Sequence, residues 1–423
     1  MTSREDCLAR DQADPLACLR GLFDLPDGTL YLDGNSLGVL PKATAARVQE
    51  VVRHEWGVDL IKSWNSAGWM DLPRRVGDKI AQLIGAGPGE VVVADSTSVN
   101  LYKVLMAAAR LQQERSHERR VIVSERSNFP TDLYIAQGVC EPLGWELRLL
   151  DAHELEAGFA PDTAILLLTH VNYRTGRMHD MAHLTRLAHE CGALAVWDLA
   201  HSAGAVPVDL TACEADYAVG CGYKYLNGGP GAPAFVWAHP RHADRFAQPL
   251  SGWLGHVAPF EFSPHYTPAP GIARYLCGTP PVLSLAALEC GVDTVLAAEP
   301  HGGLSALRAK SLALSELFVQ LVDTRCAGHG LTVVSPRDAG RRGSQVCLSR
   351  AEGGYAVVQA LIARGVIGDF RAGDSRTPDI LRFGLTPLYT RYVDVWDAVE
   401  HLRQVLQDGE WQRPEFHRRQ AVT

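Results

Sequence analysis

The sequence contains no long hydrophobic run and nothing that resembles a leader segment. Its longest purely apolar stretches, such as AILLL at 164–168, are far shorter than the roughly 20 residues of a membrane-spanning helix. The first residues, MTSREDCLARDQ, are interrupted by charges throughout, whereas a signal peptide carries an apolar core. We therefore expect a cytoplasmic protein with no membrane partner.

Paired cysteines and an excess of positive charge are also missing. The ten cysteines are scattered and form no CxxC pair, which predicts reduced thiols and no cysteine-based metal site. The formal net charge is -8, whereas a general nucleic-acid-binding surface is normally basic. We expect neither a bound metal nor a nucleic-acid partner.

What the sequence does contain is the composition of a globular enzyme. Its 423 residues, 47% of them hydrophobic, are enough for one large domain or two coupled domains. Between about 90 and 240, short apolar runs alternate with segments of helical periodicity, which is typical of a largely parallel sheet in an α/β fold. The predicted strands are VVVAD (91–95), VIVSE (121–125), WELRLL (145–150), AILLLTH (164–170), ALAVWD (193–198), ADYAVG (215–220) and APAFVW (232–237).

The pattern changes near residue 290. Later segments, among them ALRAKSLALSELFVQLV at 306–322 and ILRFGL at 380–385, indicate helices that flank a few strands. This composition favours a smaller α+β domain. We predict three parts: an N-terminal arm over 1–64 that joins the small domain, a large domain over 65–290, and the C-terminal small domain over 291–423.

The stretch CGYKYLNGGPG at 221–231 places Lys224 directly after a predicted buried strand. Most lysines are solvated surface charges, and for Lys224 alone that interpretation stays open. However, ligands of α/β folds bind at the carboxyl ends of the strands, where a lysine amine can attack the carbonyl of an aldehyde cofactor. Asp198 ends the preceding strand, and such a carboxylate pairs with the protonated ring nitrogen of pyridoxal phosphate (PLP).

Three further positions carry polar or planar side chains. Thr97 and Ser98 begin a predicted helix, where hydroxyls and backbone N–H groups bind anions, although both residue types are also ordinary helix caps. Phe129 and Asp132 lie at a second strand-to-helix junction, where Phe129 is either a ring-stacking residue or a core residue behind a proline-led helix start. Arg382, on a predicted later strand, either captures a carboxylate with its planar fork or is an exposed strand arginine.

These features follow one another in the order of a phosphate loop, a ring stacker, an acid, a lysine and a carboxylate-binding arginine. The chain is similar to kynureninases of the bacterial type, which are PLP-dependent enzymes of fold type I. The stretches that carry the resemblance are YLDGNSLG (31–38), FPTD (129–132), WDLAHSAG (197–204), YKYLN (223–227), GWLGH (252–256) and LRFGLTPLY (381–389).

The resemblance implies a PLP-dependent transferase-like fold and a homodimer with active sites at the interface. It also implies the hydrolysis of L-kynurenine to anthranilate and L-alanine in tryptophan breakdown. Lys224 would carry the cofactor, and Tyr223 is the candidate acid–base group at the substrate ketone. The positions that match cofactor contacts are Thr97, Ser98, Phe129, Asp132, Thr169, Asp198, His201, Tyr223, Lys224, Trp253 and Thr279. Those that match substrate contacts are Asn35, Trp64 and Arg382.

Three of these positions bear on assembly and specificity. Trp253 and Thr279 are candidates for reaching across from a partner subunit, and Thr279 replaces an asparagine of some relatives. Trp64 either lines the aromatic end of the substrate or is a core tryptophan. From Trp64 and Thr279 we expect a preference for unsubstituted L-kynurenine over its 3-hydroxy derivative.

Other interpretations stay open at this point. A cysteine desulfurase or selenocysteine lyase shares the strand order and the lysine but needs a thiol late in the chain, and the last cysteine is Cys347. An aminotransferase of the same fold would accumulate pyridoxamine. A non-catalytic member of the fold would bind a metabolite without turning it over.

Overall fold

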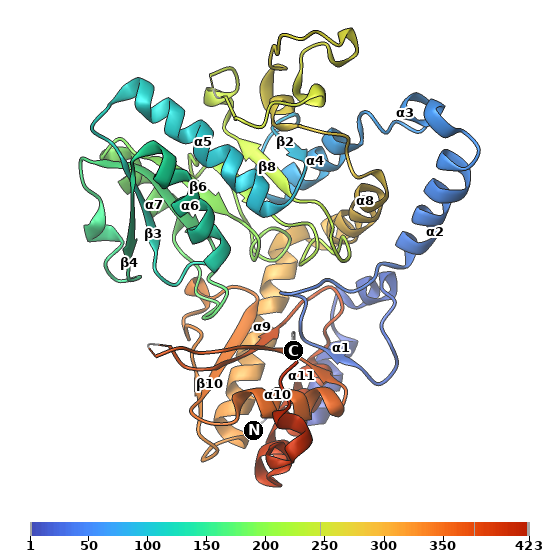
Figure 1. Cartoon of the computed structure of the whole chain (residues 1–423). Helices are drawn as coiled ribbons and strands as arrows, with labels where there is room; N and C mark the ends of the chain where they lie inside the picture. Colours follow the sequence, from blue (N-terminus) through green and yellow to red (C-terminus); the bar gives the residue numbers. More distant parts are fainter. Residues whose placement is uncertain (1, 246, 376, 421–423) are drawn as a thin grey trace. The chain divides into compact units, whose positions relative to one another are not determined.

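The computed structural model describes residues 2–245, 247–375 and 377–420, which form two compact units (Figure 1). The smaller unit consists of Met1–Ala43, Tyr173–Met178 and Thr294–Thr423, and the larger one of Thr44–Asn172 and His179–Asp293. The first segment therefore ends at Ala43 and not at the predicted residue 64, and the later division falls at 293/294 instead of 290/291.

Residues 44–64 belong to the larger unit, and a polar cluster around Glu55 links them to Trp69 of that unit. Glu55 lies in a π-helical turn, Val51–Trp56, that continues helix α2 (Lys42–Glu50). Its carboxylate accepts hydrogen bonds from Arg47 Nη1 at 2.6 Å and from Trp69 Nε1 at 2.7 Å, and its carbonyl accepts one from Ser63 Oγ at 2.6 Å. No pattern in the sequence indicates these contacts.

The larger unit is built on a seven-stranded sheet in the order β2-β8-β7-β6-β5-β3-β4. The strands from β4 to β7 are parallel, whereas β8 runs antiparallel to both of its neighbours. Every predicted strand is present, and the α/β fold class is confirmed. The strands are β2 (Val91–Val93), β3 (Val121–Glu125), β4 (Glu146–Leu150), β5 (Thr163–Thr169), β6 (Leu194–Asp198), β7 (Tyr217–Gly220) and β8 (Phe235–Ala238).

Helices pack on this sheet through apolar faces. In helix α5, Val104 and Leu105 are completely buried in one core cluster with Val196 and Val219 of the central strands. The larger unit contains α3 (Ser63–Ser66), α4 (Leu72–Leu83), α5 (Thr97–Arg115), α6 (Pro130–Leu143), α7 (Met181–Glu190) and most of α8 (Val282–Leu296). Among the described residues, no helix is sufficiently long and apolar to cross a lipid bilayer.

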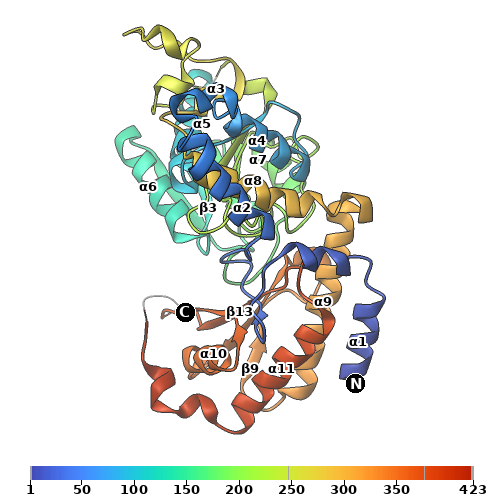
Figure 2. The same ribbon diagram turned by 90° about the vertical axis from the view of Figure 1, so that its right-hand side faces the viewer.

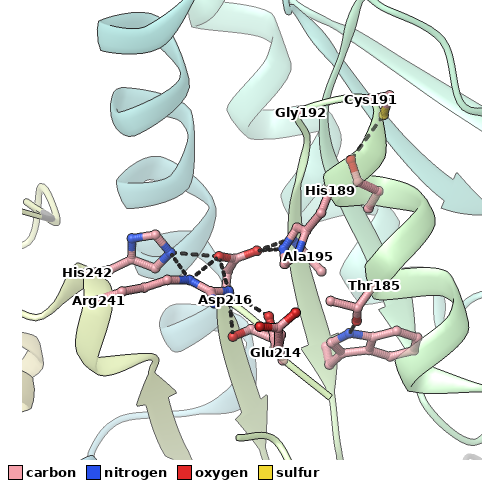
Figure 3. A network of polar contacts seen from close by, with 12 residues as sticks. Thr185, His189, Cys191, Gly192, Ala195, Glu214, Asp216, Arg241 and His242 are labelled. Carbon is pink, nitrogen blue, oxygen red and sulfur yellow. Dashed lines mark hydrogen bonds and ion pairs between the residues drawn. The ribbon is translucent and has the colours of Figure 1, made fainter. Parts of the chain in front are cut away.

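A buried aspartate anchors the amino ends of β6 and β7 (Figure 3). Asp216 precedes β7 and is 1% exposed. Its carboxylate accepts hydrogen bonds from His242 Nε2 and Arg241 Nη2, both at 2.7 Å, and from His189 Nε2 and the Ala195 backbone N–H, both at 2.8 Å. Burial alone would raise the pKa of Asp216, but the two histidines and the charge of Arg241 hold that pKa well below its usual range.

The smaller unit has an antiparallel sheet in the order β12-β13-β10-β9, and a separate parallel pair of β1 with β11 (Figure 2). Its strands are β1 (Leu30–Tyr31), β9 (Leu331–Val333), β10 (Gln345–Arg350), β11 (Val366–Ile367), β12 (Asp369–Arg371) and β13 (Ile380–Gly384). Its helices are α1 (Arg4–Gln12), α9 (Gly303–Arg325), α10 (Gly354–Ala363) and α11 (Tyr392–Gln407).

A residue of helix α1 caps the amino end of helix α11 in this unit. α1 lies beside α11, and the Asp11 carboxylate accepts hydrogen bonds from the backbone N–H groups of Tyr392 at 2.7 Å and Val393 at 3.0 Å. These N–H groups begin α11, where helical N–H groups have no partner within the helix. An acidic residue from the start of the chain therefore caps a helix near its end.

Candidate active site

A cavity of about 200 Å³ opens at the carboxyl ends of the parallel strands of the larger unit. All predicted cofactor-contacting residues except Trp253 and Thr279 line it. The lining consists of Thr97, Ser98, Phe129, Thr131, Asp132, Thr169, Asp198, Ala200, His201, Tyr223 and Lys224. The sheet therefore brings together residues that lie more than 120 positions apart in the sequence.

Lys224 supplies a half-buried amine to this cavity from the loop after β7. Its Nζ lies 3.1 Å from Nε2 of His201, which is 4% exposed. The same nitrogen lies 5.9 Å from the centre of the Phe129 ring and 5.7 Å from that of Tyr223. The amine is thus held between a histidine and two aromatic faces, and the solvated-surface interpretation of Lys224 does not apply.

Two buried carboxyl groups form another wall of the cavity. Asp198 ends β6, and its Oδ1 accepts a hydrogen bond from the Ala200 N–H at 2.7 Å. Asp132, in the first turn of α6, accepts a hydrogen bond from the Thr169 hydroxyl at 3.3 Å and lines the same cavity as Asp198. Burial raises the pKa of both carboxyls, and the charge of Asp198 raises that of Asp132 further.

Asn128, a residue that the sequence analysis did not identify, holds Phe129 of the cavity lining in place. Phe129 is 39% exposed and precedes Pro130, the first residue of α6, as expected for a proline-led helix start. Asn128, only 4% exposed, accepts hydrogen bonds from the Phe129 N–H at 2.7 Å and from the Thr169 hydroxyl. Asn128 therefore fixes the backbone of one lining residue and the side chain of another.

The amino end of α5 is shaped for an anion. Ser96, and not Thr97 or Ser98, caps the helix by accepting from the Val99 N–H at 3.3 Å. Thr97 and Ser98 are consequently not used as caps and line the cavity at the positive end of the helix dipole. The turn before them contains Asp95 at a φ of 47°.

A second lysine stabilises that turn. Lys103 is completely buried, and its Nζ donates to the Asp95 carboxylate and to the Tyr275 carbonyl, the latter at 2.7 Å. Asp95 adopts a left-handed backbone conformation that few residues other than glycine occupy. The Lys103 contact therefore explains how an aspartate is held there, and it gives Lys103 a structural role distinct from that of Lys224.

The phenol of Tyr223 is kept in its neutral form. The side chain is half-buried and lines the cavity next to Lys224. Burial raises its pKa, and the charge of Asp198 acts in the same direction. A group of this kind donates a proton in hydrogen bonds at neutral pH.

Comparison with known proteins identifies the family. Residues 307–402 match the model of the kynureninase C-terminal domain. Over 426 aligned residues the chain is 58% identical to the kynureninase of Pseudomonas fluorescens and, likewise, 58% identical to that of Burkholderia pseudomallei (strain 1106a), with complete coverage of both sequences in each case. The chain belongs to the kynureninase family.

Solved structures of other enzymes share the kynureninase fold described above. The apo cysteine desulfurase of Thermococcus onnurineus NA1 has a TM-score of 0.78 at 18% identity. The match covers 93% of this chain and 98% of the desulfurase chain. A C-DES variant with glycine covalently linked to its PLP cofactor has a TM-score of 0.79 at 16% identity, with 91% and 98% covered. At such low identity these likenesses establish the fold alone.

The remaining predicted positions of the chain lie outside the cavity. Trp64 packs edge-to-face with Trp253, the two ring centres being 6.3 Å apart, while Thr279 is exposed. Asn35 and Arg382 belong to the smaller unit and are 0% and 1% exposed. Arg382 is therefore not the exposed strand arginine that the sequence left open.

Proposed function

We propose that the chain hydrolyses L-kynurenine to anthranilate and L-alanine with PLP as its cofactor. The observation that carries the proposal is the end-to-end identity of 58% with a kynureninase. The test is to incubate the PLP-loaded protein with L-kynurenine and to follow anthranilate by its fluorescence and L-alanine by chromatography. Pyridoxamine accumulation without anthranilate would favour an aminotransferase instead.

A cytoplasmic location is also proposed, and cell fractionation tests it.

The lining of the cavity fits this cofactor. Asp198 is a buried carboxyl that accepts from the Ala200 N–H, and it suits a protonated pyridine nitrogen. Thr97 and Ser98 at the amino end of α5 suit the phosphate, and the Phe129 ring suits the face of the pyridine. When bound, PLP supplies an electron sink that stabilises negative charge on the carbon atoms of the substrate.

The chain itself handles protons and orientation. Lys224 Nζ is the group that takes the proton from the substrate α-carbon, with His201 Nε2 at 3.1 Å to hold it in place. The neutral Tyr223 phenol donates its proton toward the oxygen of the substrate ketone while water adds to the ketone carbon. Arg382 binds the α-carboxylate of the substrate through its guanidinium.

Trp64 and Thr279 are proposed to set the preference for the substrate ring. Thr279 is shorter than the asparagine of some relatives, so a 3-hydroxyl group would lack a partner, which costs about 1 to 3 kcal/mol, or roughly tenfold to a hundredfold in kcat/KM. We therefore expect kcat/KM to favour L-kynurenine over 3-hydroxykynurenine. The Trp64→His, Thr279→Asn double variant should reduce that ratio. A parent enzyme that favours the hydroxylated substrate, or a ratio that stays the same in the variant, would contradict this proposal.

A homodimer is also proposed. Large apolar side chains are exposed in two segments of the larger unit, including Ile61 at 77%, Trp56 at 58%, Phe262 at 77% and Phe260 at 61%. Large apolar side chains exposed to this extent suit a protein–protein interface. We expect sedimentation equilibrium to give twice the chain mass of 46.0 kDa, and a mass of one chain at micromolar concentration would refute the dimer.

A further inference from the structure

The guanidinium of Arg382 is held from one edge by a second charged residue. Asp369 on β12 lies directly opposite Arg382 on β13 in the antiparallel register. Arg382 Nε donates to Asp369 Oδ1 at 2.7 Å, and Nη2 donates to the other carboxylate oxygen. Both residues are 1% exposed, so this two-point ion pair is shielded from water and salt.

Two further acceptors bind N–H groups of the Arg382 guanidinium. Nη1 donates to the Tyr173 carbonyl and Nη2 to the Ser36 hydroxyl, both at 2.9 Å, while that hydroxyl donates to Asp369 at 2.6 Å. A guanidinium has five N–H groups, and these contacts engage four of them. The orientation of Arg382 is therefore set by the protein before any ligand arrives, which reduces the ordering cost of binding.

A second carboxyl, Asp33, lies near this pair. Its backbone bridges to Gly384, near the end of β13, and its Oδ1 is buried without a hydrogen-bond partner among the described residues. The charged or titratable groups that face it are Asp369, Arg371, Arg382, Tyr31 and Tyr389. Burial and the charge of Asp369 raise the pKa of Asp33 to about 8.

The carboxyls of Asp369 and Asp33 therefore contribute differently to the charge of the cluster. Despite burial, the hydrogen bonds and charge of Arg382 hold the pKa of Asp369 below its usual range, so Asp369 is ionised. Arg371 Nη2 also lies 2.8 Å from Asp369, which gives the cluster two cations and one anion while Asp33 is neutral. One positive charge remains uncompensated at neutral pH, and ionisation of Asp33 would cancel it.

We propose that Asp369 and Asp33 are positioning residues for carboxylate binding by Arg382. Ionised Asp369 fixes the guanidinium, and protonated Asp33 preserves the single positive charge that attracts the substrate α-carboxylate. The proposal rests on the function proposed for Arg382 above.

The first test is Asp369→Asn, which keeps the size of the side chain but loses the two-point ion pair. We expect KM for L-kynurenine to rise and kcat/KM to fall about 10- to 100-fold, with kcat within about threefold of the parent, because a displaced guanidinium binds the carboxylate poorly. Asp323→Asn is the matched control: Asp323 pairs with Arg337 at 2.7 Å on the surface of the same unit, and KM should not change. An unchanged or lowered KM in Asp369→Asn would overturn the proposal.

A ligand without a carboxylate separates positioning from general damage. The Ki of the amine that has hydrogen in place of the α-carboxylate of L-kynurenine should be the same in the parent and in Asp369→Asn. A variant that is merely misfolded would lose affinity for both ligands. If that loss is seen, Asp33→Asn, which mimics the protonated carboxyl and leaves the Arg382 pair intact, decides the question.

The second test is the pH dependence of Asp33→Asn. The parent KM for L-kynurenine should rise about tenfold between pH 7 and pH 9, because one unit above its pKa only about one carboxyl in eleven is protonated. Asp33→Asn cannot ionise and should lack this rise, while the Ki of the amine should follow the same pH curve in both proteins. A parent without the rise, or a variant with the same rise, would overturn the proposal.

A third variant distinguishes failure of this proposal from failure of the proposed function. Arg382→Lys keeps the charge but loses the fork, and it should raise KM about tenfold. If it does so while Asp369→Asn and Asp33→Asn match the parent, Arg382 keeps its role and only the positioning proposal falls. If the parent releases no anthranilate, the proposed reaction falls, and calorimetric Kd values for the same ligands and variants replace KM and decide the positioning proposal.

Discussion

Lys224→Ala is expected to lower the rate of anthranilate release at least about 1,000-fold and to leave PLP bound. The substitution removes the amine that the cavity lining supplies for proton transfer, and loss of such a group costs two to four orders of magnitude or more. Asp198, Phe129 and the amino end of α5 remain to hold the cofactor. The measurements are anthranilate fluorescence under saturating substrate and the PLP content of the dialysed variant.

The same assignment is checked chemically in the parent protein. Borohydride reduction should attach the cofactor to one peptide, the one that contains Lys224. Lys103 is the natural internal control because it is also a buried lysine of the larger unit, but its amine is engaged by Asp95 and the Tyr275 carbonyl. Label on Lys103, or residual turnover above one per cent in Lys224→Ala, would remove Lys224 from its proposed role.

Asp216→Asn is expected to destabilise the protein by about 3 to 5 kcal/mol, because a buried charge partner is removed while its cationic and histidine donors stay. In a unit of this size that corresponds to a fall in Tm of roughly 6 to 20 °C. Asp162→Asn is the control, since Asp162 is 46% exposed, pairs with Arg148, and should change stability by less than about 1 kcal/mol. A fall below 2 °C in Asp216→Asn would contradict the anchoring role.

The pH dependence of this effect has a definite sign. The pKa of Asp216 is lower in the folded than in the unfolded chain, so its stabilisation is fully present above about pH 4, the ordinary range of an aspartate, and is lost as the pH falls further. The difference in stability between parent and Asp216→Asn should therefore shrink below pH 4. The kcat/KM of the folded variant should stay within a few-fold of the parent, because Asp216 lies at the opposite ends of β6 and β7 from the cavity.

The strands of the larger unit were predictable because each is a short, mainly apolar run bounded by turn residues, and most are buried along their whole length. Most of the cavity lining was predictable for a related reason: polar residues that follow parallel strands meet at one edge of the sheet. The antiparallel direction of β8 was not, because strand periodicity carries no information on direction.

The hydrogen-bond and ion-pair partners of the charged residues also could not be predicted from the sequence. Asp216 lies within a run that reads as an ordinary strand, and nothing nearby points to His189 or His242. Asn128 has no signal other than its place between a strand and a helix. Arg382 could be proposed as a site residue from its motif, but its pairing with Asp369 depends on the register of two strands that only the folded structure fixes.

The cap that Asp11 provides to α11 has a consequence for synthesis on the ribosome. The two ends of this contact are 381 residues apart in the sequence. At about 5 to 20 residues per second, the first helix emerges roughly 20 to 75 s before its partner is made. α1 has only nine residues, too few to persist alone in water, and its buried Cys7 has nothing to pack against in that interval. The nascent N-terminus must therefore remain unfolded and accessible to chaperones and proteases until almost the whole chain has been translated.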